Sequence, residues 1–194
     1  MEKCFQMLQE ENGKNPVKFT ETTVSGETVF SGKIFDIRKD VARVMTGETR
    51  NRELIVHPGG VTILAIREGK ILMVRQFRYG AGTEMLELPA GKLEKDDKDV
   101  LAAAKRELSE ETGFEAQNWT DLGYIFTTPA ICTEKLYLFK AENLVAGRPH
   151  PDDGEFIEHC EVEISEVYKM IQSGKINDAK TICAIFRGLG GGVL

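Results

Sequence analysis

The stretch GKLEKDDKDVLAAAKRELSEETGF, residues 91–114, determines both the fold and the chemistry expected of this chain. In its second half, Arg106 and three glutamates precede Gly113; the glutamates are Glu107, Glu110 and Glu111. On a helix with 3.6 residues per turn, these three carboxylates fall within about 100° of one another. Because like charges repel, the cluster favours a hard divalent cation, Mg²⁺ or Mn²⁺, which commonly brings substrate phosphates with it. The other interpretation is a solvated acidic helix face.

The residues around this cluster predict where the helix begins and ends. Asp99 is the expected N-cap, and Gly113 is the expected left-handed residue at the C-terminus. Leu101, Ala104 and Leu108 lie at helical spacing and form the expected core stripe. We therefore expect the acidic face to lie beside that stripe, half out of the core.

The same stretch resembles the Nudix box, the signature of hydrolases that split a nucleoside diphosphate linked to another moiety. The family pattern is Gly, five residues, Glu, seven residues, Arg-Glu-apolar, any residue, Glu-Glu, any residue, Gly-apolar. Its second half is complete here, in Arg106, Glu107, Leu108, Glu110, Glu111, Gly113 and Phe114. The first half departs from it, because Gly91 stands one residue early and Lys98 occupies the glutamate position. One extra residue in the acidic loop 94–99 explains both departures, with Asp97 replacing the glutamate.

Length and composition indicate one enzyme domain with a short extra segment. The chain has 194 residues, of which 41% are hydrophobic and 8% aromatic, enough for a core. Its net charge is -6, and no run of Lys or Arg marks a surface for nucleic acid or anionic membrane. The sequence shows no C-x-x-C pair, no signal-peptide pattern and no apolar stretch near the roughly 18 residues that span a membrane. We expect a cytoplasmic protein without nucleic-acid or membrane partners.

The first third of the chain has the pattern of a small antiparallel β segment. Val, Phe, Thr and Ile are frequent there, and Gly26, Gly32 and Gly47 interrupt the pattern. The expected strands are 18–24, 27–31 and 35–44, continued by 52–56. The chain is thereby divided into a flexible leader (1–14), an N-terminal β meander (15–56) and a main domain (57–194).

The main domain combines short strands with helices. Residues 61–66 and 71–76 are expected to form a hairpin, because Gly69 lies in the four residues that join them. Further elements are strands at 84–88, 121–126, 136–141 and 156–164, and helices at 165–173, capped by Ser165, and at 178–188. The order of elements alone gives an α+β class, and the Nudix resemblance implies an α/β/α sandwich with a mixed sheet.

Outside the box, five segments resemble the ADP-ribose pyrophosphatases of the Nudix family, so the resemblance covers roughly residues 18–188. The segments are RELIVHPGG at 52–60, VRQFRYG at 74–80, LELPAGKLE at 86–94, TPAICTEKLYLF at 128–139 and DDGEFIE at 152–158. In that family, a proline about 16 residues beyond the last glycine of the box marks a preference for ADP-ribose. Pro129 stands at that distance from Gly113. The alternative is an ordinary loop proline between strands.

The resemblance assigns substrate-binding roles to polar residues of these segments. Arg78 corresponds to the substrate-contacting arginine of the family, and Arg52 is the second choice, with Glu53 beside it also expected to bind substrate. The planar fork of donors on an arginine matches phosphate oxygens. Glu134 is expected to accept hydrogen bonds from ribose hydroxyls. The alternatives are surface ion pairs for the arginines and an exposed strand-edge position for Glu134.

Metal and catalytic roles also follow from the resemblance. The implied metal ligands are the backbone carbonyl of Ala90 and the carboxylates of Glu107, Glu110, Glu111 and Glu155. On the loop 151–155, Asp153 matches the general base of similar enzymes by position, although the base is usually Glu, and Glu155 matches a metal ligand. The same loop sequence is also typical of a surface turn.

Two classes of function remain open. The first is a Mg²⁺- or Mn²⁺-dependent hydrolase that converts ADP-ribose to AMP and ribose 5-phosphate, with GDP-mannose or another nucleoside diphosphate sugar as the alternative substrate. The second is a non-catalytic Nudix-like sensor of ADP-ribose. We favour the enzyme because all three box glutamates that follow Arg106 are present.

The meander 15–56 also predicts an assembly. Two or three strands alone are marginal in water, so the apolar residues of this segment need burial. In similar ADP-ribose pyrophosphatases the segment crosses to a partner subunit and helps to form the wall around the base. A two-fold homodimer is therefore expected, with a monomer as the alternative.

Overall fold

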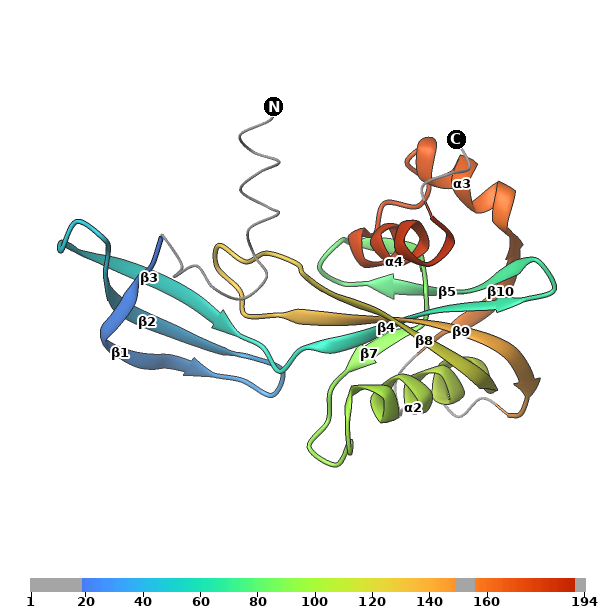
Figure 1. Ribbon diagram of the computed structural model, residues 1–194, viewed down its shortest axis with the longest axis horizontal. Coiled ribbons are helices and arrows are strands. Elements are labelled where there is room, and N and C mark those ends of the chain that lie inside the picture. Colours follow the sequence, from blue (N-terminus) through green and yellow to red (C-terminus); the bar gives the residue numbers. More distant parts are fainter. Residues whose placement is uncertain (1–18, 149–155, 191–194) are drawn as a thin grey trace, which may run out of the picture. The chain divides into compact units, whose positions relative to one another are not determined.

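The computed structural model describes residues 19–148 and 156–190 (Figure 1). The chain divides into two compact units, Met1–Ile55 and Val56–Leu194. The first unit is built on a three-stranded sheet with the order β1-β2-β3. Its strands are β1 (Thr22–Ser31), β2 (Asp36–Arg43) and β3 (Thr49–Val56). The expected leader, residues 1–14, lies outside the described residues.

The glycines of the first unit serve two different purposes. Gly32 and Gly47 lie between strands, and Gly47 has a φ of 88°, which favours glycine. The expected break at Gly26 was wrong, because β1 continues through it opposite Asp40 of β2. A Cβ on Gly26 would lie 1.9 Å from an oxygen of the Asp40 carboxylate. Glycine at this position therefore permits a close approach across the sheet and does not make a turn.

A seven-stranded mixed sheet forms the centre of the second unit (Figure 1). Its main order is β10-β5-β4-β9-β8, with β6 beside β5 and β7 beside β4. β4 and β9 are parallel, whereas the remaining pairs are antiparallel. The strands are β4 (Gly60–Arg67), β5 (Lys70–Arg78), β6 (Thr83–Glu87), β7 (Ala90–Lys92), β8 (Phe114–Phe126), β9 (Lys135–Ala146) and β10 (Glu158–Glu163).

Helices cover both faces of this sheet (Figure 1). They are α2 (Val100–Thr112), α3 (Ile164–Gln172) and α4 (Ala179–Leu189). Leu108 of α2 packs with Ile63 on one face, and Ile185 of α4 packs with Leu64 on the other. β4 is therefore buried on both sides, as its unbroken apolar sequence indicates. The predicted α/β/α sandwich with a mixed sheet, preceded by a small β segment, is confirmed.

The helix that carries the acidic cluster has the predicted ends. Asp99 caps its N-terminus by accepting a hydrogen bond from the N–H of Ala102 at 2.8 Å. Gly113 ends the helix in the left-handed region with a φ of 73°. Of the expected core stripe, Leu108 is fully buried, whereas Leu101 is only half-buried. The caps therefore fix the register in which the glutamates are presented.

Other boundaries differ from the expectation. The β4–β5 hairpin turns over two residues, Glu68 and Gly69, with φ values of 50° and 78° that are typical of a type I′ turn. β8 begins at Phe114 because its polar first half pairs with the end of β9. α3 begins before Ser165, so Ser165 is not its cap, and Glu163 at the cap position makes no side-chain cap bond.

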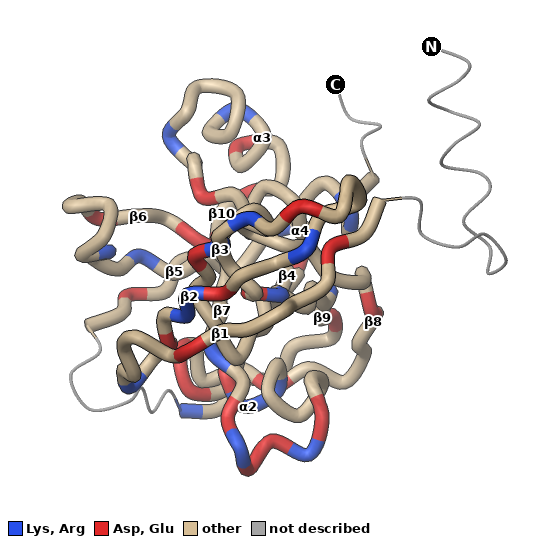
Figure 2. Tube along the Cα trace, turned by 90° about the vertical axis from the view of Figure 1, so that its left-hand side faces the viewer, with Lys and Arg blue, Asp and Glu red and all other residues tan. Residues whose placement is uncertain are grey.

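Charge is mixed along the whole described trace. Figure 2 shows Lys and Arg interspersed with Asp and Glu, including the loop that leads into α2. That loop, residues 94–99, contains four acidic and two basic side chains. Among the described residues, no helix combines the length and the apolar character needed to cross a bilayer.

Candidate active site

The acidic cluster of α2 faces the first residues of β7. Glu111 is only 6% exposed, and its carboxylate accepts a hydrogen bond from the N–H of Ala90 at 3.1 Å. Glu107 lies against Gly91, because a Cβ on Gly91 would stand 2.0 Å from the carboxylate carbon of Glu107. Glycine is therefore needed here for the close approach of a functional side chain. Two predicted carboxylates and the predicted backbone ligand residue thus lie together.

The central sheet holds β7 in this place. Ala90 pairs with Thr62 of the buried strand β4, and the carbonyl of Pro89 accepts a hydrogen bond from the N–H of Ile63 at 2.9 Å. The acidic helix is also held in place. Leu108, which lies between Glu107 and Glu110 in the sequence, packs into the core and anchors α2. The site is therefore built from rigid elements, which is how precise geometry is maintained.

Arg106 binds the remaining carboxylates of the cluster. Its guanidinium donates to Glu107 at 2.8 Å and to Glu110 at 2.9 Å. It also donates to both oxygens of Asp97, at 3.2 and 3.1 Å. Burial alone lowers the pKa of Arg106, but the hydrogen bonds to Asp97 and the charge of Glu107 raise it above its ordinary value, so the group stays cationic. Asp97, the expected replacement for the missing box glutamate, is thus joined to the cluster through Arg106.

The donor set of the cluster fits a hard divalent cation. Carboxylate and carbonyl oxygens are the ligands that Mg²⁺ and Mn²⁺ prefer. Within 19–148 and 156–190, no three His, Cys, Asp or Glu side chains form a group that could hold a metal ion. Mg²⁺ does not require such a cage, because it usually keeps several waters and binds through one or two carboxylates. The other predicted residues, Asp153 and Glu155, lie outside the described residues.

Arg78 is bound to a buried carboxylate that the sequence patterns did not reveal. Glu87 of β6 is 1% exposed, and both its oxygens accept hydrogen bonds from Arg78, at 2.8 and 2.6 Å. Lys180 of α4 donates to the same carboxylate at 2.6 Å. Burial raises the pKa of Glu87, but the bonds from Arg78 and Lys180 outweigh it and hold the pKa below its ordinary value. Glu87 is therefore a buried anion shared by two cations.

Arg78 is also within electrostatic reach of the acidic cluster. The hydrogen bond to Glu87 raises the pKa of Arg78, burial lowers it, and the charges of Glu87 and then Glu111 raise it further. The Arg78 side chain is 38% exposed. Arg78 is therefore a partly exposed guanidinium that the charge of Glu111 reaches.

The first turn of α4 fastens this network to the sheet. Asp178 caps α4, and its carboxylate accepts bonds from the N–H of Thr181 at 3.0 Å and from the ammonium of Lys180 at 2.9 Å. The hydroxyl of Thr181 in turn accepts the N–H of Leu88 at 2.9 Å. α4 therefore holds Leu88 in place, which directly follows Glu87 and stands two residues before Ala90.

Pro129 and Glu134 lie in the connection between β8 and β9. Pro129 is exposed at the second position of a hydrogen-bonded turn, 128–131, where proline is favoured. Glu134 is partly buried; it accepts a hydrogen bond from the hydroxyl of Thr127 at 2.7 Å and lies 3.5 Å from Nδ1 of His57. Its carboxylate is thus oriented by neighbours within the second unit.

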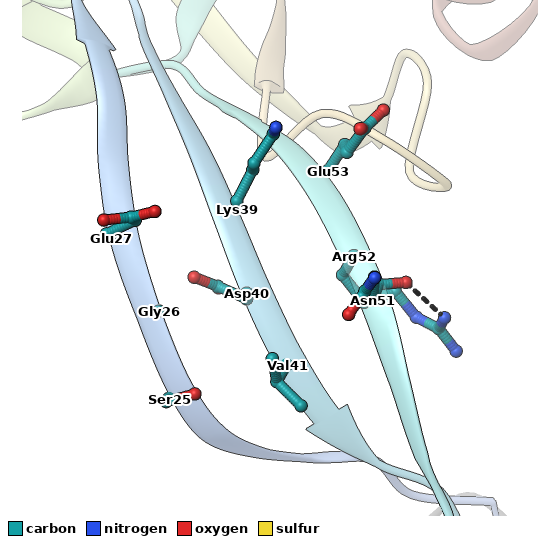
Figure 3. A pocket seen from close by; sticks show the side chains of 9 residues that line it. All are labelled: Ser25, Gly26, Glu27, Lys39, Asp40, Val41, Asn51, Arg52 and Glu53. Carbon is teal, nitrogen blue, oxygen red and sulfur yellow. Dashed lines mark hydrogen bonds between the residues drawn. The ribbon is translucent and has the colours of Figure 1, made fainter.

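Arg52 and Glu53 lie on β3 of the first unit. They contribute to the lining of an open depression of about 430 Å³ on the three-stranded sheet, together with residues of β1 and β2 such as Lys39 and Asp40 (Figure 3). Arg52 donates to both carboxylate oxygens of Glu21, at 2.8 and 2.6 Å. The surface ion pair that was the alternative for Arg52 is therefore present.

Comparisons with known proteins agree with this geometry. The NUDIX domain family matches residues 56–185. The chain is 39% identical over 168 residues to "ADP-ribose pyrophosphatase" of Bacillus subtilis (strain 168), covering 85% of this chain and 90% of that protein. It is 36% identical over 173 residues to "Methanol dehydrogenase activator" of Bacillus methanolicus, covering 86% and 91%. This chain belongs to the Nudix family.

A solved structure shows the same fold at greater sequence distance. The crystal structure of an ADP compounds hydrolase matches with a TM-score of 0.79 at 22% identity, covering 90% of this chain and 95% of that chain. Nudix hydrolases generally use divalent metal ions, which agrees with the donors gathered on α2.

Proposed function

We propose that this protein is a divalent-metal-dependent hydrolase that splits the pyrophosphate of ADP-ribose into AMP and ribose 5-phosphate. One observation carries the proposal: Glu107 and Glu111 are held against Ala90 and Gly91 in a chain of the Nudix family. The choice of ADP-ribose is supported by the name of the 39% identical relative and by Pro129 in its exposed turn.

We assign Mg²⁺ or Mn²⁺ to the acidic cluster. The proposed ligands are the carbonyl of Ala90 and the carboxylates of Glu107, Glu110, Glu111 and Glu155, of which one or two would bind the ion directly. When bound, the ion would neutralise charge on the pyrophosphate and lower the pKa of a coordinated water. Arg106 orients Glu107 and Glu110, and the Ala90 N–H orients Glu111. Asp153 is the proposed general base.

Arg78 is the proposed contact to the substrate pyrophosphate. Its guanidinium offers two parallel donors that match phosphate oxygens, and it is partly exposed. Glu134 is the proposed acceptor for ribose hydroxyls. Its carboxylate is only partly buried, and the hydroxyl of Thr127 fixes one of its oxygens. These two residues supply recognition, whereas the cluster on α2 supplies the chemistry.

The substrate assignment is tested by kcat/KM values for ADP-ribose, GDP-mannose, UDP-glucose and a nucleoside triphosphate. ADP-ribose should give the highest value. If GDP-mannose exceeded ADP-ribose about tenfold, the alternative substrate would be correct. If ADP-ribose bound tightly without hydrolysis, the protein would be a sensor.

We also propose a homodimer in which the three-stranded sheet, with Arg52 and Glu53, forms part of the wall around the base. Every residue of β1 is exposed within the single chain, including Val24 at 50% and Phe30 at 52%. Such apolar residues favour burial against a partner. Sedimentation equilibrium at micromolar concentration should give about twice the chain mass of 21.6 kDa. A mass near that of one chain would contradict the dimer.

A further inference from the structure

Glu87 has two cationic partners that differ in their exposure. Arg78 occupies both oxygens of the Glu87 carboxylate and is 38% exposed, so it lies partly at the surface. Lys180 bonds one of the same oxygens and is only 14% exposed. Lys180 is also bound to Asp178, which caps α4. One partner of the buried anion is therefore partly open to ligands, whereas the other is mostly buried and held by a second carboxylate.

The difference in exposure between Arg78 and Lys180 becomes important if Arg78 moves. Arg78 bonds Glu87 through Nε and Nη2, and a guanidinium that turns this edge to a pyrophosphate must give up those bonds. A buried carboxylate without a cation is costly, because burial penalises its charged form. Lys180 is placed to prevent that cost, since its ammonium lies 2.6 Å from a Glu87 oxygen. Glu87 would then remain neutralised without Arg78.

We infer that Lys180 is a positioning residue that keeps Glu87 neutralised while Arg78 binds the pyrophosphate of the substrate. The inference rests on the proposed contact between Arg78 and the substrate. Without Lys180, Arg78 would be the sole cation that the described residues supply to Glu87, and substrate would have to compete with that ion pair. Lys180 therefore sets how readily Arg78 is available.

A purely structural role for Lys180 makes a different prediction. The attachment of α4 does not depend on its ammonium, because Asp178 bonds the N–H of Thr181 and the Thr181 hydroxyl bonds the N–H of Leu88. Loss of Lys180 should therefore leave the fold in place. The positioning role and the purely structural role of Lys180 are distinguished by the affinity for substrate. They also differ in whether that affinity recovers when the charge of Glu87 is removed.

The test is the Kd of ADP-ribose, measured by calorimetry in EDTA so that the proposed hydrolysis does not proceed. Lys180→Met should weaken binding about tenfold, which corresponds to about 1.4 kcal/mol. Lys180→Arg should bind like the wild type. The double variant Lys180→Met with Glu87→Gln should recover to within about threefold of the wild type, because no buried charge then holds Arg78. Lys169→Met, on the exposed face of α3, is the matched control.

Arg78→Met separates failure of this inference from failure of the proposed function. If the wild type did not bind ADP-ribose, or Arg78→Met bound it normally, the proposed substrate contact would be wrong and the inference would fall with it. If Arg78→Met weakened binding but Lys180→Met did not, the inference alone would be overturned. Loss of affinity in Lys180→Met without recovery in the double variant would also overturn it. If Lys180→Met did not fold, Lys180→Gln would give the same comparison.

Discussion

The second unit contains two clusters of charged side chains that differ in their balance. The single guanidinium of Arg106 on α2 bonds the carboxylates of Asp97, Glu107 and Glu110, and Glu111 adds a further carboxylate directly after Glu110. Where β6 ends and α4 begins, the carboxylates of Glu87 and Asp178 are bound to two cations, Arg78 and Lys180. The charges of this second cluster therefore balance. An excess of acid attracts a further cation, whereas a balanced network is complete without one. We therefore assign the chemistry to the first cluster and the positioning of Arg78 to the second.

The largest effect is expected from Glu111→Gln in the acidic cluster. Glutamine keeps the size of the side chain and an oxygen that can accept the Ala90 N–H, so the fold should survive. Turnover should fall by about two to three orders of magnitude, because charge stabilisation at the metal is lost. Steady-state kinetics at saturating Mg²⁺ measure it, with Glu115→Gln on the exposed part of β8 as the control. Near-normal turnover of Glu111→Gln would show that the assignment of Glu111 as a metal ligand is wrong.

A smaller loss is expected from Gly91→Ala. The added methyl would occupy the space of the Glu107 carboxylate, which lies at the end of a flexible side chain and must move away. Turnover should fall about tenfold to hundredfold through misplacement of that ligand, with little change in thermal unfolding. Gly80→Ala is the matched control, because its Cβ would meet open space. Equal turnover in both variants would show that the approach of Glu107 to Gly91 is unimportant.

Arg106→Met tests whether the acidic excess needs a cation. Without the guanidinium, Asp97, Glu107 and Glu110 would repel one another, and the free energy of unfolding should fall by about 1–2 kcal/mol in metal-free buffer. Mg²⁺ should restore part of this loss and stabilise the variant more than the wild type. Chemical denaturation with and without Mg²⁺ measures both values. An equal gain from Mg²⁺ in the two proteins would show that the acidic cluster does not attract the ion in place of Arg106.

The smallest effect is expected for the pH dependence of the balanced network. Because the pKa of Glu87 is held below its ordinary value of 4.5, its ionised form contributes stability that is complete above that value. The contribution is lost as the pH falls through the lowered pKa. The wild type should therefore exceed Glu87→Gln in unfolding free energy at pH 7, and the gap should shrink below pH 4.5. If the difference in unfolding free energy between the two proteins grew as the pH fell, the pKa of Glu87 would be raised rather than lowered.

The sequence predicts the first cluster much better than the second. Asp99, the box glutamates and Gly113 stand on one helix, so local spacing gives their caps and their common face. The partners of Glu87 are nine and 93 positions away, and no local pattern connects them. No local signal was available, because Glu87 stands between two leucines in LEL, where alternation predicts a solvent-facing position.

Boundaries were missed where pairing rather than pattern decides the structure. β7 has three residues, too few to show alternation, and it forms because it pairs with β4. The first half of β8 is polar and lies at the edge of the sheet, so only its ladder with β9 identifies it as a strand. The role of Gly91 was missed for the same reason, since a glycine pattern does not show which side chain approaches it.

The proposed hydrolysis is tested by the products formed from ADP-ribose in H₂¹⁸O. We expect equal amounts of AMP and ribose 5-phosphate, with one ¹⁸O in one of the two, in the presence of Mg²⁺ and not in EDTA. Recovery of intact ADP-ribose from pure protein with Mg²⁺ or Mn²⁺ would contradict it.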